Sequence, residues 1–380
     1  PSPGRHRTDT LLPMSATRSQ RLQKSFLKYQ HIFVFAAPAV FVTVVLFAAP
    51  TGGSGGMDYW LEYWWLFPFF LLGATTVNTV GISGSALFVP FLIFIFPVLA
   101  GETLTPETLV KVGLISESFG LSASSIAFIQ YGLVDRRLAL TIVAGSVPFV
   151  IAGALLSFFI PEPLFHAALG AALLVAGYLM LKADIGHDGP DETDDAVATD
   201  GGPAAEFPDD DGKLGPVGVD ATEGGKVTRV DREGDTYEYS WSGYLERFTN
   251  YSVGGTFQGL AGFGSGELGI ISQLRTGVPT RVAIGTNHII VATTAILASL
   301  VHVFGGTILG AFGVGGVHSL SLASTPWNMV VFTVPATVTG GQIAPYVSNA
   351  LDTGTIQKGV AALFATISAA LFLMAGGVGI

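Results

Sequence analysis

Two runs of small residues interrupt apolar segments of this 380-residue chain: residues 81–85 read GISGS and residues 262–266 read GFGSG. A helix that begins after such a break presents free backbone N–H groups, whose partial positive charge favours an anion. Small side chains let an oxyanion approach the backbone, and the serines add hydroxyl donors. The alternative is that these small residues only let membrane helices pack closely. We expect an anion site that includes the following residues: Gly81, Ser83, Gly84, Ser85, Gly262, Gly264, Ser265 and Gly266.

Four further polar side chains are candidates to complete this site. Asn78 and Gln258 precede the two runs by about one helical turn, and Thr286 and Asn287 follow on a later segment. Their amide and hydroxyl groups can donate hydrogen bonds to an anion. We expect these four residues to lie near the bound anion.

Two acidic residues lie at predicted membrane depth. Glu267 directly follows the second run, and Glu117 lies within the apolar segment 108–131. An ionisable residue at this depth is costly and is a functional hypothesis by default. A protonated carboxyl would couple anion movement to a proton, whereas an ionised one would repel the anion or hold a cation. When the two halves of the chain are aligned, His288 takes the position next to that of Glu117, so we expect these two side chains to approach each other; a paired structural carboxylate is the alternative for both acids.

Basic residues flank several predicted membrane segments. Lys111, Arg275 and Arg281 lie near segment ends. Such residues usually anchor a helix end at the membrane interface and set its topology. The alternative is that they draw anions towards the mouth of a transporter.

A competing interpretation is an enzyme, because residues 81–84 form a literal Gly-x-Ser-Gly sequence. This sequence resembles the nucleophile motif of rhomboid intramembrane proteases, in which Ser83 would need a histidine such as His288 as its base. The second run has Gly264 at the equivalent position, and a single nucleophile does not require two breaks. A channel is a third possibility, but channels usually have a continuous polar stripe rather than two localised breaks.

The composition identifies lipid as the main solvent of this chain. Hydrophobic residues make up 49% of it and charged residues only 12%, whereas soluble domains carry about 25% charged residues. The chain has no cysteine, which excludes disulfides, thiolate metal sites and cysteine nucleophiles. We expect no cofactor and no metal site.

The net charge of −10 comes from one segment. Residues 183–240 contain 17 Asp and Glu against 4 Lys and Arg, whereas the remainder has 11 acidic and 14 basic residues. This acidic segment has few aromatic residues and no apolar period, which is typical of a disordered linker; a regulatory or partner-binding role is the alternative. The membrane body is therefore mildly basic, and we expect no nucleic acid as a partner.

The apolar segments predict an all-α polytopic membrane protein. A basic tail at 1–30 precedes an extra membrane helix at 31–49, which we interpret as a retained signal anchor. Most later segments are long enough to span about 30 Å of hydrocarbon. Segments 85–99 and 266–274 are shorter and are expected to be arms of hairpins whose tips are the two small-residue runs. The predicted segments are 60–80, 85–99, 108–131, 138–160, 163–182, 243–263, 266–274, 282–304, 327–349 and 355–378.

The two halves of the membrane body align with each other. Gly81 matches Gly262 at an offset of 181 residues, and Gly153 matches Gly340 at an offset of 187. Matches that keep the same order at similar offsets indicate an internal duplication.

Basic residues near segment ends place the N-terminus and the acidic loop in the cytoplasm. Each repeat, 60–182 and 243–380, then makes three net crossings plus a hairpin, so the second repeat is inverted relative to the first. Inverted repeats with paired glycine-interrupted segments are typical of secondary transporters, whose site lies between the two breaks. We expect a multi-pass transporter of the cell membrane that works by alternating access; its oligomeric state does not follow from the sequence.

The sequence resembles the sulfite exporter TauE/SafE permeases over about residues 60–380. The resemblance rests on the glycine-rich elements 81–90 and 262–268. It also rests on residues 277–287, which are similar to a short family loop that leads into an Ala-x-Gly-Thr helix start. The resemblance implies a duplicated helical bundle that carries sulfite, organosulfonates or related anions.

The chain departs from this family pattern at four positions. Serine replaces glycine of the usual consecutive run at Ser83, Ser85 and Ser265, and Ile271 stands where the second half often has proline. These departures affect the choice of anion more than the fold. The partners that the resemblance implies are a small anionic substrate and the lipid bilayer.

Overall fold

The computed structural model describes most of the chain. The described residues are 18–50, 56–130, 133–182, 221–223, 226–230, 236–239, 241–313, 321–350 and 353–377. The predicted basic tail before Arg18 and much of the predicted acidic loop lie outside them.

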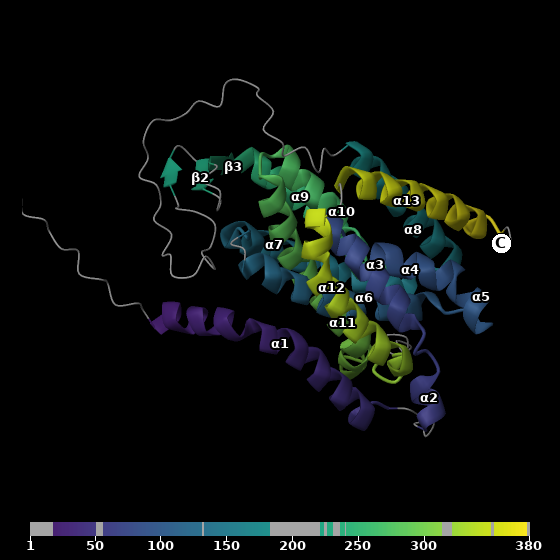
Figure 1. The fold of residues 1–380 in the computed structure, drawn as a ribbon. Helices are drawn as coiled ribbons and strands as arrows, with labels where there is room; N and C mark the ends of the chain where they lie inside the picture. The colour runs from purple at the N-terminus through teal and green to yellow at the C-terminus, as the bar shows by residue number, and fades with distance from the viewer. Residues whose placement is uncertain are drawn as a thin grey trace, which may run out of the picture.

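The described residues form a helical bundle with one small sheet (Figure 1). Helices suit these apolar segments because they satisfy every interior backbone N–H and C=O group within the segment, as lipid requires. The prediction of an all-α membrane protein is confirmed. The helices are α1 (Arg18–Ala48), α2 (Met57–Leu61), α3 (Leu66–Val80), α4 (Ser85–Phe94), α5 (Phe96–Ala100), α6 (Pro106–Gln130), α7 (Arg136–Leu156), the 3-10 turn η1 (Ser157–Phe159), α8 (Glu162–Lys182), α9 (Trp241–Ala261), α10 (Ser265–Arg275), α11 (Thr280–Ala311), α12 (Trp327–Ala350) and α13 (Thr353–Ala375).

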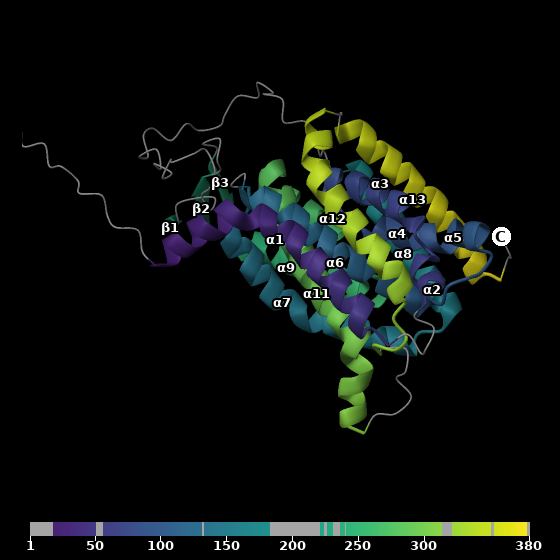
Figure 2. The same cartoon turned by 60° about the horizontal axis from the view of Figure 1, so that its bottom comes forward.

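Three helical stretches of the described chain are long and apolar enough to cross a bilayer: Pro106–Ile129, Arg136–Phe159 and Val282–Ala311. The segments differ from the predicted ones mainly at their ends. Segment 85–99 is divided into α4 and α5 at Ile95. Helix α11 continues to Ala311, and its C-terminal end projects beyond the other helices (Figure 2).

Two helical hairpins form where the sequence predicts them. Residues 81–84 join α3 to α4, and residues 262–264 join α9 to α10. Gly81 and Gly262 end the first arms with φ angles of 77° and 90°. Glycine adopts this left-handed region without steric cost. The same backbone device therefore breaks both helices.

Helix packing follows the same pattern in both halves. Helix α3 packs against α12 as α9 packs against α7, and α6 contacts α12 as α11 contacts α7. The remaining large contacts join α6 to α11 and α8 to α13, and α8 and α13 lie side by side in Figures 1 and 2. Four helices of the first half therefore correspond to four of the second: α3 to α9, α6 to α11, α7 to α12, and α8 to α13. When each helix is replaced by its counterpart, the same set of contacts results, as an internal duplication predicts.

Close backbone approach accompanies two of these equivalent contacts. A Cβ built on Gly153 of α7 would lie 2.0 Å from the carbonyl oxygen of Thr256 in α9. One built on Gly340 of α12 would lie 2.8 Å from the carbonyl oxygen of Leu71 in α3. Because the sequence alignment pairs Gly153 with Gly340, equivalent glycines permit equivalent helix contacts.

Helix α1 lies along the outside of the bundle, where it contacts α6 and α12 (Figure 1). Its contacts are fewer than those among the repeated helices, which agrees with its prediction as an extra N-terminal helix. Partly buried Phe41 of α1 packs on Phe119 of α6, with ring centroids 4.6 Å apart.

A small antiparallel sheet lies in the acidic segment, where the sequence predicts a disordered linker. Its strands, in the order β1-β2-β3, are Ala221–Glu223, Lys226–Val230 and Thr236–Tyr239. The side chain of Tyr237 is buried, and its hydroxyl donates to Asp135 Oδ2 at 2.9 Å. This part of the segment therefore contacts the start of α7; residues 183–220 lie outside the described residues.

Candidate functional site

The tips of the two hairpins lie against each other in the interior of the bundle. A Cβ built on Gly266 would lie 2.8 Å from the backbone nitrogen of Ser83. One built on Gly262 would lie 3.2 Å from Cβ of Ser85. All four residues are buried. Glycine at these positions therefore permits the two breaks, which are about 180 residues apart in sequence, to meet.

The carboxyl group of Glu117 in α6 accepts hydrogen bonds from the donors of the first break. Its Oε1 accepts from Ser83 Oγ at 2.6 Å and from Gln258 Nε2 at 3.5 Å. Its Oε2 accepts from the backbone nitrogen of Ser85 at 3.1 Å and also from the Ser85 hydroxyl. Ser83 and Ser85 therefore present an oxyanion-binding arrangement, and a side-chain carboxyl occupies it.

The carboxyl group of Glu267 in α10 bridges the two breaks. Its Oε2 accepts from the backbone nitrogen of Gly264 at 2.9 Å, and its Oε1 accepts from the backbone nitrogen of Ser83 at 3.2 Å. The first contact is a helix N-cap interaction, which satisfies an N–H group that α10 leaves free. Glu267 thus satisfies one backbone donor from each half of the chain.

Asn287 of α11 joins the same two breaks from another side. Its Nδ2 donates to the carbonyl oxygens of Gly81 at 3.0 Å and Gly266 at 2.9 Å. Its Oδ1 accepts from the hydroxyl of Tyr251 at 2.5 Å, and that hydroxyl accepts from Gln273 Nε2. The amide of Asn287 is therefore fixed in orientation by groups from three helices.

The other predicted site residues have different surroundings. Asn78 Nδ2 donates to the carbonyl oxygen of Ala74, and Thr286 Oγ1 accepts from the backbone nitrogen of Asp135. The buried hydroxyl of Ser265 and the buried Oδ1 of Asn78 have no hydrogen-bond partner within the described chain. Thr286 therefore supports the loop before α7, whereas Ser265 is a free donor at the second break.

His288 does not hydrogen-bond to Glu117, although the sequence predicts that the two approach each other. Its ring packs on Phe128 with ring centroids 4.8 Å apart. Both ring nitrogens are buried without a hydrogen-bond partner among the described groups. The alignment of the two halves pairs His288 with the residue next to Glu117 in sequence. The rotation of α11 about its axis decides which side chain of α6 the ring actually contacts.

Two residues of this network were missed by the sequence analysis. Tyr251 lies seven residues before Gln258 on α9, and Thr294 lies seven residues after Asn287 on α11. The Thr294 hydroxyl donates to Gln258 Oε1 at 2.7 Å and so helps to orient the amide that contacts Glu117. Polar residues seven apart share one face of a helix. This spacing from the predicted site residues could have identified both residues in the sequence.

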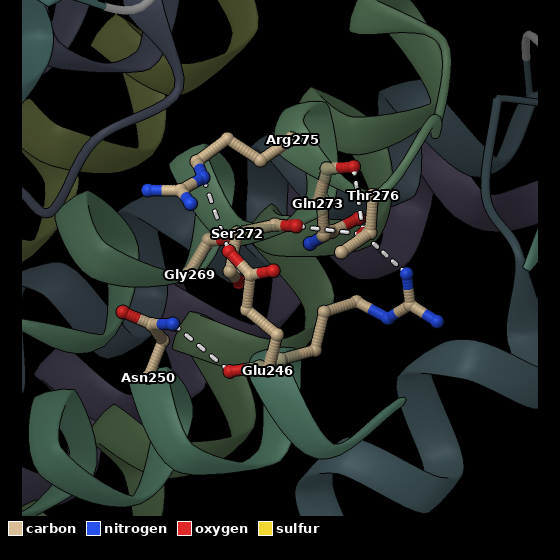
Figure 3. Close-up of polar contacts among 8 residues, drawn as sticks. Glu246, Asn250, Gly269, Ser272, Gln273, Arg275 and Thr276 are labelled. Atoms are coloured by element: carbon tan, nitrogen blue, oxygen red, sulfur yellow. Dashed lines mark hydrogen bonds and ion pairs between the residues drawn. The ribbon is translucent and has the colours of Figure 1, made fainter. Parts of the chain in front are cut away.

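The basic residues near the hairpins have partners at helix ends. Arg275 pairs with Glu246, with Nε and Oε1 3.1 Å apart (Figure 3). Lys111 Nζ donates to the carbonyl oxygen of Ser321 at 3.0 Å. No basic group of the described residues lies within ion-pair distance of Glu117 or Glu267. The side chain of Arg281 lies outside what the structure describes.

A pocket of about 310 Å³ lies elsewhere, between α3, α4 and α13. Apart from Thr76, its lining is apolar and includes Phe69, Phe88 and Leu363. The Thr76 hydroxyl already donates to a carbonyl oxygen of its own helix. This lining offers an anion no charged partner, so the meeting point of the breaks remains the candidate site.

Comparison with known proteins gives one family and a few relatives. The family model described as "Sulfite exporter TauE/SafE" matches residues 65–371. The chain is 24% identical to the "Probable membrane transporter protein YunE" of Bacillus subtilis over 289 residues, covering 75% of this chain and 88% of the relative. It is also 39% identical over 85 residues to an "Undecaprenyl-diphosphatase" of Tropheryma whipplei, covering 19% of this chain and 29% of the relative. No solved structure gives a significant match.

Proposed function

The chain belongs to the sulfite exporter TauE/SafE family, and we propose that it is a secondary transporter that moves a small anion across the cell membrane by alternating access. Sulfite, another sulfur oxyanion or an organosulfonate is the proposed substrate. The observation that carries this proposal is the convergence of two helix breaks in a buried location, with the hydroxyls of Ser83, Ser85 and Ser265 beside them.

Alternating access is supported by the equivalence of helix contacts in the two halves. An inverted pair of repeats can exchange conformations while the site between them stays in place. The breaks that form the site come one from each half. A movement of one half against the other would therefore act directly on the contacts among Ser83, Gly266 and Glu267.

Proton coupling is part of the proposal. Glu117 and Glu267 are buried carboxyl groups that contact the proposed site, and His288 is a third candidate because it is buried on α11. The two carboxyl groups have direct hydrogen bonds to the breaks. His288 packs on Phe128 instead, so its contribution would require a movement of α11.

The alternative is an intramembrane serine protease that uses Ser83. Serine proteases of this kind need a base that takes the hydroxyl proton. Ser83 Oγ donates to Glu117, and the ring of His288 packs on Phe128. Labelling by a serine-directed phosphonate, together with peptide cleavage that Ser83→Ala abolishes, would establish the protease and overturn the transporter proposal.

Anion exchange in proteoliposomes tests the proposed function. The full-length protein is reconstituted and exchange of labelled anions is measured for sulfite, sulfate, thiosulfate, methanesulfonate and chloride. We expect exchange of at least one sulfur-containing anion and little exchange of chloride. An absence of exchange for every anion in the panel would overturn the proposal.

Ser265→Ala tests the location of the site. Its hydroxyl has no protein partner within the described chain, so its removal leaves no protein group unsatisfied. We expect apparent anion affinity to fall about tenfold, because one hydrogen bond to a charged group contributes about 1.5 kcal/mol. Ser157→Ala is the matched control, because that hydroxyl donates to the carbonyl oxygen of Ala154. Equal affinities in the two variants would place the anion elsewhere.

A further inference from the structure

The hydrogen-bond donors around Glu117 form one defined set, which we call the Glu117 donor set. It comprises the hydroxyls of Ser83 and Ser85, the backbone N–H of Ser85 and the side-chain amide of Gln258. Together these donors reach both oxygens of one carboxyl group. Sulfonates and sulfite also present two or three oxygens on one face. The same donors can therefore bind either the carboxyl group of Glu117 or a sulfur oxyanion.

We infer that the transported anion exchanges with the carboxylate of Glu117 for this donor set, and that Glu117 takes up one proton for each anion bound. This inference rests on the proposed function and adds a specific exchange step to it. An ionised Glu117 gives up its hydrogen bonds, binds a proton and becomes neutral, while the anion takes its place. The charge of the site is the same before and after the step, so a monovalent anion and a proton enter together without net charge.

Ser83 alone can stay in contact with a neutral Glu117 while the other donors turn to the anion. The N–H groups of Ser85 and Gln258 can only donate, whereas a serine hydroxyl can donate or accept. Ser83 Oγ lies 3.4 Å from the carbonyl oxygen of Gly262 in addition to its contact with Glu117. Its hydroxyl can therefore turn to Gly262 and accept the proton of a neutral carboxyl group. A neutral carboxyl group is a weaker acceptor than a carboxylate or another anion, so the Ser85 N–H can pass from Glu117 to the bound anion.

A second observation points to a ligand at the same place. The Ser265 hydroxyl, at the start of α10, is fully buried and has no partner in the described chain. Ser265 adjoins Gly266, whose added Cβ would lie 2.8 Å from the backbone of Ser83. A free donor thus lies at the opposite break from the Glu117 donor set, where an anion larger than a carboxylate would gain a further hydrogen bond.

The groups that face Glu117 from neighbouring helices identify it as the exchanging residue. Helix α4 and its break contribute the two serines, α9 contributes Gln258, and α11 contributes Thr294 through Gln258. Helix α12 meets α6 at Ser116, through the hydroxyl of Thr333. Among the described residues, the titratable group that acts on Glu117 is Glu267 of α10, which bridges the backbone of both breaks.

The histidines of α11 contact groups other than Glu117. His288 packs on Phe128, and His302 Nε2 contacts the carbonyl oxygen of Gly259. Exchange at Glu267 would remove the backbone bridge between the breaks, whereas exchange at Glu117 leaves that bridge in place. Glu267 is therefore a positioning residue.

Glu117→Gln separates exchange from proton coupling. Glutamine is close in shape to a neutral glutamic acid and cannot take up a proton. In proteoliposomes, we expect accumulation driven by an inward proton gradient to fall to the level seen without a gradient, whereas anion–anion exchange, although altered in rate, stays detectable. Glu246→Gln is the matched control and should keep both activities; Glu246 lies near the start of α9, in the ion pair with Arg275 at the end of α10 (Figure 3).

The pH dependence of binding gives a second measurement on the same proteins. At pH values where Glu117 of the anion-free site is ionised, wild-type anion affinity should fall about tenfold for each unit of pH increase, since one proton is then taken up per anion. The anion used is the one that exchanges fastest in the panel. Titration of the anion itself affects all three proteins equally. The change of affinity with pH should therefore be steeper in wild type and in Glu246→Gln than in Glu117→Gln, and this difference reports the exchange step.

The outcomes distinguish this inference from the proposed function. Proton-driven accumulation that persists in Glu117→Gln, or wild-type accumulation driven by sodium instead of protons, would overturn the exchange step while transport stands. If Glu117→Gln does not fold, internal pH measured with pyranine during downhill anion entry into wild-type liposomes decides the question. About one proton entering per monovalent anion is expected, and no proton movement would overturn the inference. An absence of exchange in wild type would overturn the proposed function itself.

Discussion

At the scale of single residues, the serines that stand where the resemblance leads us to expect consecutive glycines contact Glu117. Two of the substituted positions are Ser83 and Ser85, and the hydroxyls of both donate to Glu117. Glycine at either position would remove one donor from this carboxyl group. The serines therefore belong to the local chemistry of Glu117, and this sequence difference lies at the proposed site.

The free energy of unfolding should depend on the charge of Glu267. Its two oxygens accept from the backbone N–H groups of Gly264 and Ser83. Glutamine keeps one acceptor and places an NH₂ group against the other N–H. We expect Glu267→Gln to lower stability by about 1–3 kcal/mol, measured by chemical unfolding in detergent.

Glu246→Gln is the control for this measurement. Its ion pair with Arg275 is solvent-exposed at the helix ends (Figure 3). Such pairs contribute roughly 0–1 kcal/mol, so little change is expected. Equal stability of Glu267→Gln and wild type would mean that Glu267 is neutral and does not cap the break as a carboxylate.

At the scale of helices and strands, the contact between α7 and α9 depends on the absence of side chains. A Cβ built on Gly259 would lie 2.1 Å from the carbonyl oxygen of Val150 in α7. We expect Gly259→Ala to separate these helices and lower stability by about 1–3 kcal/mol, measured as a lower thermal midpoint in detergent.

Gly310→Ala provides the matched comparison within a helix. A Cβ there would meet nothing within 4 Å. Alanine restricts the unfolded chain more than glycine, so this variant should be unchanged or more stable by about 0.5–1 kcal/mol. Similar midpoints for Gly259→Ala and Gly310→Ala would contradict the close packing of α7 and α9.

The sheet in the acidic segment should be held to the membrane body by Tyr237. Its hydroxyl donates to Asp135 at the N-cap of α7. Removal of one hydrogen bond of about 1 kcal/mol predicts roughly fivefold faster amide exchange in β2 and β3 for Tyr237→Phe. Hydrogen–deuterium exchange with mass spectrometry measures this, with Tyr178→Phe on the exposed face of α8 as the control. Unchanged exchange would mean that the apolar contacts of Tyr237 alone hold the sheet.

The hairpins could be predicted from sequence because their signals are local. Glycine at the end of an apolar segment predicts a left-handed residue, and a short second segment predicts a returning arm, as at Gly81 and Gly262. Contacts between helices depend instead on how each helix is rotated and tilted. His288 illustrates this difference, since the sequence places it beside the equivalent of Glu117 while its ring packs on Phe128.

At the scale of the whole molecule, helix contacts between the two halves explain why both halves contribute residues to the candidate site. Helix α3 of the first half packs on α12 of the second, and α9 of the second packs on α7 of the first. Neither half therefore encloses its own hairpin. This interleaving brings the two breaks together, with Glu117 from one half and Glu267 from the other.

If the two halves are inverted relative to each other, as proposed, the topology predicts where single cysteines are accessible. The chain has no native cysteine, so any introduced one is the sole target of a maleimide. Met57 and Phe312 are exposed, and the predicted topology places both outside the cell. Arg275 and Lys182 are exposed near helix ends that the same topology places in the cytoplasm.

A membrane-impermeant maleimide should label Met57→Cys and Phe312→Cys in intact cells. It should label Lys182→Cys and Arg275→Cys only after the cells are opened. Met57 precedes the first hairpin and Arg275 ends the second, so the two hairpins must enter from opposite sides if the repeats are inverted. Labelling of Arg275→Cys and Met57→Cys from the same side would exclude inversion. The two breaks would then meet without the symmetry that alternating access requires, and transport would need another mechanism.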